Sequence, residues 1–92
     1  GYYCLAILHQ GRLVGRLDSK FERVERRLLV RTVYLEPDVS LDDTLLNGIA
    51  GSLRELAAFL GAETIAVARG EPVRLAPMLA ERIATSARQT DC

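Results

Sequence analysis

The sequence predicts an α+β fold, with a three-stranded antiparallel meander, a long helix, a crossover to a fourth strand and a C-terminal helix. Three observations lead to this prediction. Short apolar runs near the start are separated by turn residues, an apolar repeat at helical spacing fills the middle, and another short apolar run precedes a second helical segment. Because strand–helix–strand units usually cross over to a parallel neighbour, the fourth strand is expected to lie parallel to the third.

The meander is expected to have strands at about residues 2–8, 12–18 and 28–35. The first is apolar almost throughout, which is typical of a strand buried on both faces. Gln10-Gly11 then indicates a hairpin turn, since glycine adopts the positive φ that such turns need. Gly15 leaves a gap in the second strand that a neighbouring backbone can fill. A charged connection over residues 20–27 leads to the third strand.

Strict alternation of side chains assigns two faces to the second and third strands. In the second strand one face would carry Leu13, Gly15 and Leu17, and the other Val14, Arg16 and Asp18. In the third strand one face would carry Leu28, Val30, Thr32 and Tyr34, and the other Leu29, Arg31, Val33 and Leu35.

A long helix is expected at about residues 41–60, after Pro37 has ended the third strand. Ser40 and Asp43 have the spacing of a capping box, and Gly61 is expected as the left-handed C-cap. The apolar stripe consists of Leu45, Ile49, Leu53, Leu56 and Leu60. Gly48 and Gly51 lie inside this helix, each costing about 1 kcal/mol relative to alanine. We infer from this cost that the helix lies very close to the sheet there.

A short apolar strand at 64–68 and a last helix at about 76–87 complete the chain. The last helix has an apolar stripe of Met78, Leu79, Ile83 and Ala87. Pro77 is tolerated only in its first turn. Residues 1–88 are therefore expected to form one small α/β domain, with a frayed tail at 89–92. Because the chain begins with Gly1 and enters directly into an apolar segment, we expect it to be a piece of a larger protein.

The composition excludes several classes of function. The net charge is zero, which argues against a strongly basic nucleic-acid binder. Cys4 and Cys92 do not form a disulfide framework, and with His9 as the only histidine the common zinc sites are out of reach. No signal peptide and no membrane-length apolar run is present, so we expect a cytoplasmic protein without membrane contact.

The candidate binding residues are cations around the connection between the second and third strands: Arg16, Lys20, Arg23, Arg26 and Arg27. They could hold nucleic-acid phosphates, with Arg16 positioned by Asp18. The alternative is a solvated hairpin face, in which Glu22 and Glu25 neutralise half of the charge. The run lacks the repeated aromatic interleaving that base stacking uses.

No residues suggest catalysis. No nucleophile has an evident base beside it, there is no glycine-rich phosphate loop, and His9 is explained as a turn residue. Asp42 and Asp43 form a carboxylate pair, but their position at a helix start favours capping. The sequence therefore predicts no catalytic residue, no cofactor and no metal site.

Several segments nevertheless resemble the C-terminal region of the winged-helix, crosslink-repair DNA glycosylase family. They are Gly1-Tyr2-Tyr3-Cys4-Leu5, the run from Gly11 to Lys20 with Arg23 after it, Val33-Tyr34-Leu35-Glu36-Pro37, and the stretches Leu53–Ala57 and Phe59–Ala62. The resemblance covers about residues 1–70. It implies a larger protein of tandem winged-helix modules that binds DNA and excises damaged bases.

In that family a glutamine–apolar–glutamine triplet, placed well upstream, is the catalytic signature. Gln10 and Gln89 are the only glutamines here and form no such triplet. The resemblance thus implies a non-catalytic C-terminal domain that supports DNA binding or packs on the winged-helix modules, with DNA as a partner of the whole protein.

Two alternatives remain open. The order of elements also resembles the C-terminal part of N-acetyltransferase superfamily enzymes, which bind the cofactor pyrophosphate at the start of the long helix. Here that segment, residues 37–43, has no glycine and is acidic, so it would repel the phosphates of acetyl-CoA. The remaining alternative is a structural domain with this fold and no acetyl-CoA site, which can form homodimers when isolated.

Overall fold

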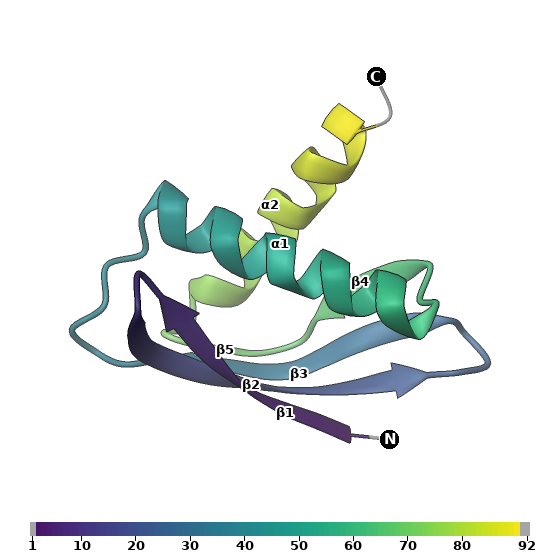
Figure 1. Ribbon diagram of the computed structural model, residues 1–92, viewed down its shortest axis with the longest axis horizontal. Coiled ribbons are helices and arrows are strands. Elements are labelled where there is room, and N and C mark those ends of the chain that lie inside the picture. Colours follow the sequence, from purple (N-terminus) through teal and green to yellow (C-terminus); the bar gives the residue numbers. More distant parts are fainter. Residues whose placement is uncertain (1, 91–92) are drawn as a thin grey trace.

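The computed structural model describes residues 2–90, with side chains up to residue 84. Within this range a mixed sheet is covered on one face by two helices (Figure 1). The elements are β1 (Tyr2–His9), β2 (Arg12–Glu22), β3 (Arg27–Leu35), α1 (Asp43–Leu60), β4 (Thr64–Val67), β5 (Gly70–Glu71) and α2 (Leu75–Thr90). The α+β fold predicted from the sequence is confirmed, including the order of meander, helix, strand and helix.

The sheet has the order β1-β2-β3-β4, and β5 pairs with the far end of β3. β1, β2 and β3 form the antiparallel meander, whereas β4 runs parallel to β3, as the crossover predicts. Gln10 and Gly11 both have positive φ (54° and 76°), which confirms the tight hairpin between β1 and β2. β5 was not predicted, because two residues beside a proline carry no strand pattern.

The prediction of a charged connection over residues 20–27 is wrong. β2 continues to Glu22, and the loop is reduced to residues 23–26. Phe21 pairs with Leu28, so apolar cross-strand packing continues past the charged residues.

Two β-bulges change the faces that strict alternation assigned. At the first, Ile7 pairs with Gly15 and Leu8 with Leu13, so Val14 is an extra residue on β2. Val14 is consequently buried, whereas Leu13 is 59% exposed. At the second, Asp18 pairs with Thr32 and Ser19 with Val30, which makes Arg31 the extra residue on β3. The face predictions for both strands fail here because a bulge reverses the alternation beyond it.

The prediction that the first strand is buried on both faces is also wrong. β1 pairs with β2 alone and forms an edge of the sheet, and Ile7 is its only buried residue. The prediction rested on the apolar character of the strand, but apolar composition by itself does not distinguish a strand covered on both faces from an edge strand.

Helix α1 begins later than predicted. Asp42, with extended backbone, is the N-cap, and its side chain accepts a hydrogen bond from the backbone N–H of Leu45 at 2.9 Å. The predicted capping box of Ser40 and Asp43 is therefore wrong, since Asp43 is already the first helical residue. Gly61 is the left-handed C-cap, as predicted, with φ of 80°.

The glycines of the sheet and of the helix differ in their surroundings. A Cβ on Gly15 would overlap the carbonyl oxygen of Tyr34, so the close backbone approach predicted at Gly15 is confirmed. By contrast, a Cβ on Gly48 or Gly51 would meet no atom nearer than 4.0 Å. The inference that α1 lies very close to the sheet at these two glycines is wrong.

One core lies between the sheet and the helices. Its members are Ile7, Val14, Leu17, Leu28, Val30, Val33, Leu35, Leu45, Leu46, Ile49, Ala50, Leu53, Ala57, Leu75, Leu79 and Ile83. They include most of the predicted helix stripes. Arg82 of α2 donates hydrogen bonds to Asp43 and Asn47 of α1, both at 2.9 Å, and so joins the two helices.

The C-terminal helix has Pro77 in its first turn, as predicted, and extends to Thr90, beyond its predicted end. The rest of the predicted tail, residues 91–92, lies outside the described residues, as does the side chain of Ala87. Over the described part of the chain, neither helix has the length and apolarity needed to cross a membrane.

Candidate docking surface on the uncovered face of the sheet

The sheet face opposite the helices is not covered by any other described element (Figure 1). We call it the open face. The side chains that define it are Tyr2, Cys4 and Ala6 of β1, Arg16, Asp18 and Lys20 of β2, Arg31, Thr32 and Tyr34 of β3, and Glu71 of β5. Most are polar or aromatic, in contrast to the aliphatic face beneath the helices.

Cations and tyrosine rings are paired on the open face. The guanidinium carbon of Arg16 lies 4.6 Å from the ring centroid of Tyr34. The ring of Tyr2 has the Lys20 ammonium at 5.5 Å and the Arg31 guanidinium carbon at 5.2 Å. These distances fall within the range of cation–π attraction, which orders long cationic side chains that would otherwise be mobile.

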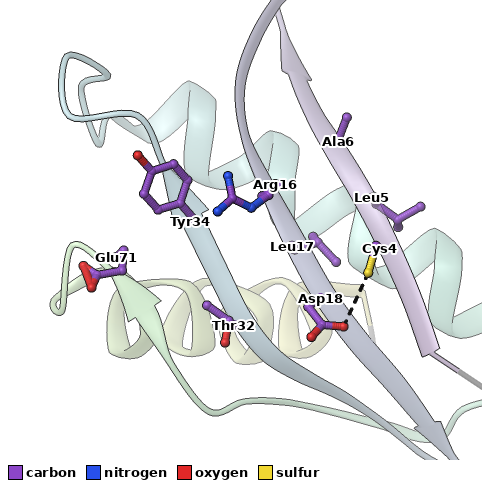
Figure 2. A pocket seen from close by; sticks show the side chains of 9 residues that line it. All are labelled: Cys4, Leu5, Ala6, Arg16, Leu17, Asp18, Thr32, Tyr34 and Glu71. Atoms are coloured by element: carbon purple, nitrogen blue, oxygen red, sulfur yellow. Dashed lines mark hydrogen bonds between the residues drawn. The ribbon is translucent and has the colours of Figure 1, made fainter.

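Acidic groups moderate the positive charge of this face. Arg31 lies 4.0 Å from a carboxylate oxygen of Asp18, and the Cys4 thiol is 3.8 Å from the other. Glu71 adds a second carboxylate at the β5 end (Figure 2). The open face thus has three cations and two carboxylates, a net charge of about +1 at neutral pH.

A shallow cavity of about 600 Å³ lies on this face between β1, β2, β3 and β5. Thr32 and Tyr34 of β3 lie on one side of it and Cys4 and Ala6 of β1 on the other, with Arg16 and Asp18 of β2 between them (Figure 2). It is large enough for one or a few side chains of a docked protein.

The five predicted cations do not form one site. Arg16 and Lys20 lie on the open face, about 13 Å apart at roughly 3.3 Å per residue of strand. Arg23 is exposed in the loop between β2 and β3. Arg26 lies 3.5 Å from Glu63 and donates to the carbonyl oxygen of Gly61 at 3.4 Å, so it joins this loop to the end of α1.

Arg27, the fifth of these cations, is paired with Glu22 across the base of the loop at 2.5 Å. The hydrogen bond and the charge of Glu22 raise the pKa of Arg27 above its ordinary value. Because Arg26 and Arg27 already have acidic partners, the loop offers less free positive charge than its sequence indicates.

Sequence reasoning missed Tyr2, Arg31 and Tyr34. The expectation that no aromatic residue accompanies the cations is wrong: Phe21 follows Lys20 in the chain. Across the sheet, Tyr2 and Tyr34 each lie on a strand next to a cation. The available signal was the meander itself, since neighbouring strands bring Tyr2 opposite Lys20 and Tyr34 opposite Arg16.

The start of α1 has no feature that suggests a phosphate site. The carboxylate of Asp42 occupies the position where an anion would meet the helix amides, and Asp43 follows it. Across the described side chains, no group of three His, Cys, Asp or Glu residues could hold a metal ion.

The arrangement is suited to docking. Arginine and tyrosine are enriched at protein interfaces, where their flat groups bury large areas and still form hydrogen bonds. No protein-family model matches the chain, and no solved structure matches it. The resemblance to the winged-helix glycosylase family therefore remains a hypothesis that rests on the sequence motifs.

Proposed function

We propose that this chain is the non-catalytic C-terminal domain of a winged-helix DNA-repair glycosylase-like protein, and that it packs on the upstream winged-helix modules through its open face. It supports DNA binding by holding those modules in place. Any base excision is carried out by the upstream part of the protein. The proposal includes a cytoplasmic location, which was inferred from the sequence.

The observation that carries the proposal is the pairing of Arg16 with Tyr34 on a sheet face without a covering layer. A sheet in an α+β domain usually buries at least one of its faces. Here the two helices bury the face opposite the open face, so the open face remains available for another domain. The open face has a mixed charge and ordered cations, which fit a protein surface better than a polyanion.

Direct contact with DNA is the second candidate, and the position of Arg23 favours it. Arg23 is exposed at the loop between β2 and β3 and makes no ion pair within the described residues. Lys20 lies on the strand that leads into this loop. Arg23 could therefore contact a backbone phosphate while the open face, which includes Lys20, is docked.

The test uses the full-length protein with a double variant on the open face and a single variant in the loop between β2 and β3. We expect Arg16→Ala/Arg31→Ala to uncouple this domain, so that calorimetry shows two unfolding transitions where the parent shows one. DNA affinity should fall, while its dependence on salt stays the same, because no phosphate contact is lost.

Arg23→Ala, which lies outside the open face, serves as the control and tests direct contact. If Arg23 contacts a phosphate, the slope of log K against log salt becomes shallower by about 0.9. The docking proposal fails if Arg16→Ala/Arg31→Ala leaves both the unfolding profile and DNA binding unchanged. The family assignment fails if the coding sequence before Gly1 contains no winged-helix modules.

A further inference from the structure

The outer edge of β1 is a free pairing edge. β1 is eight residues long and pairs only with β2 among the residues that the structure describes. The opposite edge of the sheet is made of β4 and β5, which have four and two residues. The longest continuous unpaired strand edge in this sheet is therefore on the β1 side.

Edge strands normally have features that prevent further pairing, such as lysine, proline, inward-pointing charges or a bulge. β1 has no Lys, Arg, Asp, Glu or Pro from Tyr2 to His9. The bulge beside it puts the extra residue, Val14, on β2, so β1 itself remains regular. This strand thus has none of the usual protection.

The packing beneath the helices is incomplete at the same edge. Leu5, Leu17 and Val33 lie side by side in one row of the sheet, and their exposure is 41%, 5% and 0%. A cavity of about 230 Å³ lies beside Leu5, between β1 and α1. Gly48 and Ser52 of α1 line it and leave room, since a Cβ on Gly48 would meet only His9, at 4.0 Å.

An added strand would complete this row and put alternate side chains into the cavity. We propose that the added strand is β1 of a second copy of this chain, paired antiparallel about a two-fold axis. In this dimer one sheet extends through both copies, and all four helices lie on the same side of that sheet.

The residues of β1 are suited to pairing with themselves. A two-fold axis at Leu5 puts Leu5 opposite Leu5, Tyr3 opposite Ile7, and Tyr2 opposite Leu8. Tyr2 and Leu8 are the most exposed apolar side chains of β1, at 60% and 69%, and each would cover the other. No like charges face each other along the paired strands. The net charge of the whole chain is zero, so there is no overall electrostatic repulsion between two copies.

Sedimentation velocity over a range of concentrations tests the proposal on the chain of residues 1–92. We expect a reversible monomer–dimer equilibrium in the unmodified chain. Leu5→Lys/Leu8→Lys should weaken the dimer by roughly tenfold or more, because pairing would then desolvate two ammonium groups on each strand.

Val24→Lys/Phe59→Lys is the matched control, with the same change of charge at apolar residues that are 93% and 85% exposed elsewhere. It should dimerise like the unmodified chain. The proposal is overturned if the unmodified chain is monomeric at every concentration, or if a folded Leu5→Lys/Leu8→Lys variant, checked by circular dichroism, dimerises as well as the control.

Amide hydrogen exchange of the unmodified chain gives an answer even if the lysine variant does not fold. Protection of β1 should increase with protein concentration, while that of β4 stays constant. The proposal is overturned if the protection of β1 does not depend on protein concentration. A strand of another protein would then be the partner for this edge.

Discussion

Gly15 and Tyr34 lie where the backbones of β2 and β3 approach each other closely. A Cβ on Gly15 would overlap the Tyr34 carbonyl oxygen and lie 2.9 Å from Cδ2 of Leu35. Gly51 in α1 has a different environment, because its nearest neighbour for such an atom is the end of the Arg54 side chain at 4.0 Å. The same residue type is thus required by packing in one place and is merely tolerated in the other.

We expect Gly15→Ala to destabilise the fold, by an amount near the upper end of the roughly 1–3 kcal/mol typical of overpacking. Gly51→Ala should instead stabilise it by about 1 kcal/mol, since it removes the conformational cost of a helical glycine without a clash. Urea denaturation of both variants measures the difference. Equal effects of the two substitutions would contradict the close approach at Gly15.

Part of the open face could be predicted from the sequence. Arg16 and Lys20 were identified because they are cations around the connection predicted between the second and third strands. The prediction from the sequence placed Arg31 on the same face as Val33. In the structure, the bulge at Arg31 turns both Arg31 and its neighbour Thr32 toward the open face. A bulge depends on the pairing with the neighbouring strand, and one strand's sequence does not reveal it.

At the scale of elements, the start of α1 depends on a single side chain. Asp42 and Ser40 are both good N-cap residue types, and they are two positions apart. Only Asp42 accepts a backbone hydrogen bond, from Leu45. Ser40 lies outside the helix and is exposed.

Asp42→Ala should lower the free energy of unfolding by about 1 kcal/mol, the usual cost of losing an N-cap. Ser40→Ala should change it by a few tenths of a kcal/mol at most, as is common for exposed positions. Thermal unfolding of the two variants checks this order. A larger loss for Ser40→Ala would restore the capping box that the sequence suggested.

The elements themselves were predicted more reliably than their ends. Long apolar repeats identify α1 and α2, and the apolar runs identify four of the strands, because burial on one side imposes a period on the sequence. β5 is too short to have a period, and its pairing with Val33 and Tyr34 follows from the tertiary fold. The extension of β2 to Glu22 likewise depends on β3, which supplies Leu28 as a partner for Phe21.

For the whole molecule, β3 is the strand on which the other parts converge. It pairs with β2 on one side and with β4 and β5 on the other. Its residues Leu28, Val30 and Val33 are completely buried beneath the helices. β5, by contrast, contributes two residues, of which Glu71 is exposed.

We expect native-state hydrogen exchange in dilute solution to be slowest in β3 and faster by orders of magnitude in β5. The physical reason is that β3 amides exchange only when most of the core opens, whereas β5 can open locally. Mass spectrometry with peptide-level resolution distinguishes the two segments. Similar rates in β3 and β5 would show that the sheet opens as one unit.

The open face also affects how this domain can change in evolution. Its side chains contribute little to the core, so substitutions at Arg16, Thr32 or Tyr34 should alter surface chemistry with small effects on stability. The residues beneath the helices have no such freedom, because each fills a part of one packed core. One face of the sheet therefore maintains the fold, while the other can acquire or exchange binding partners through single mutations.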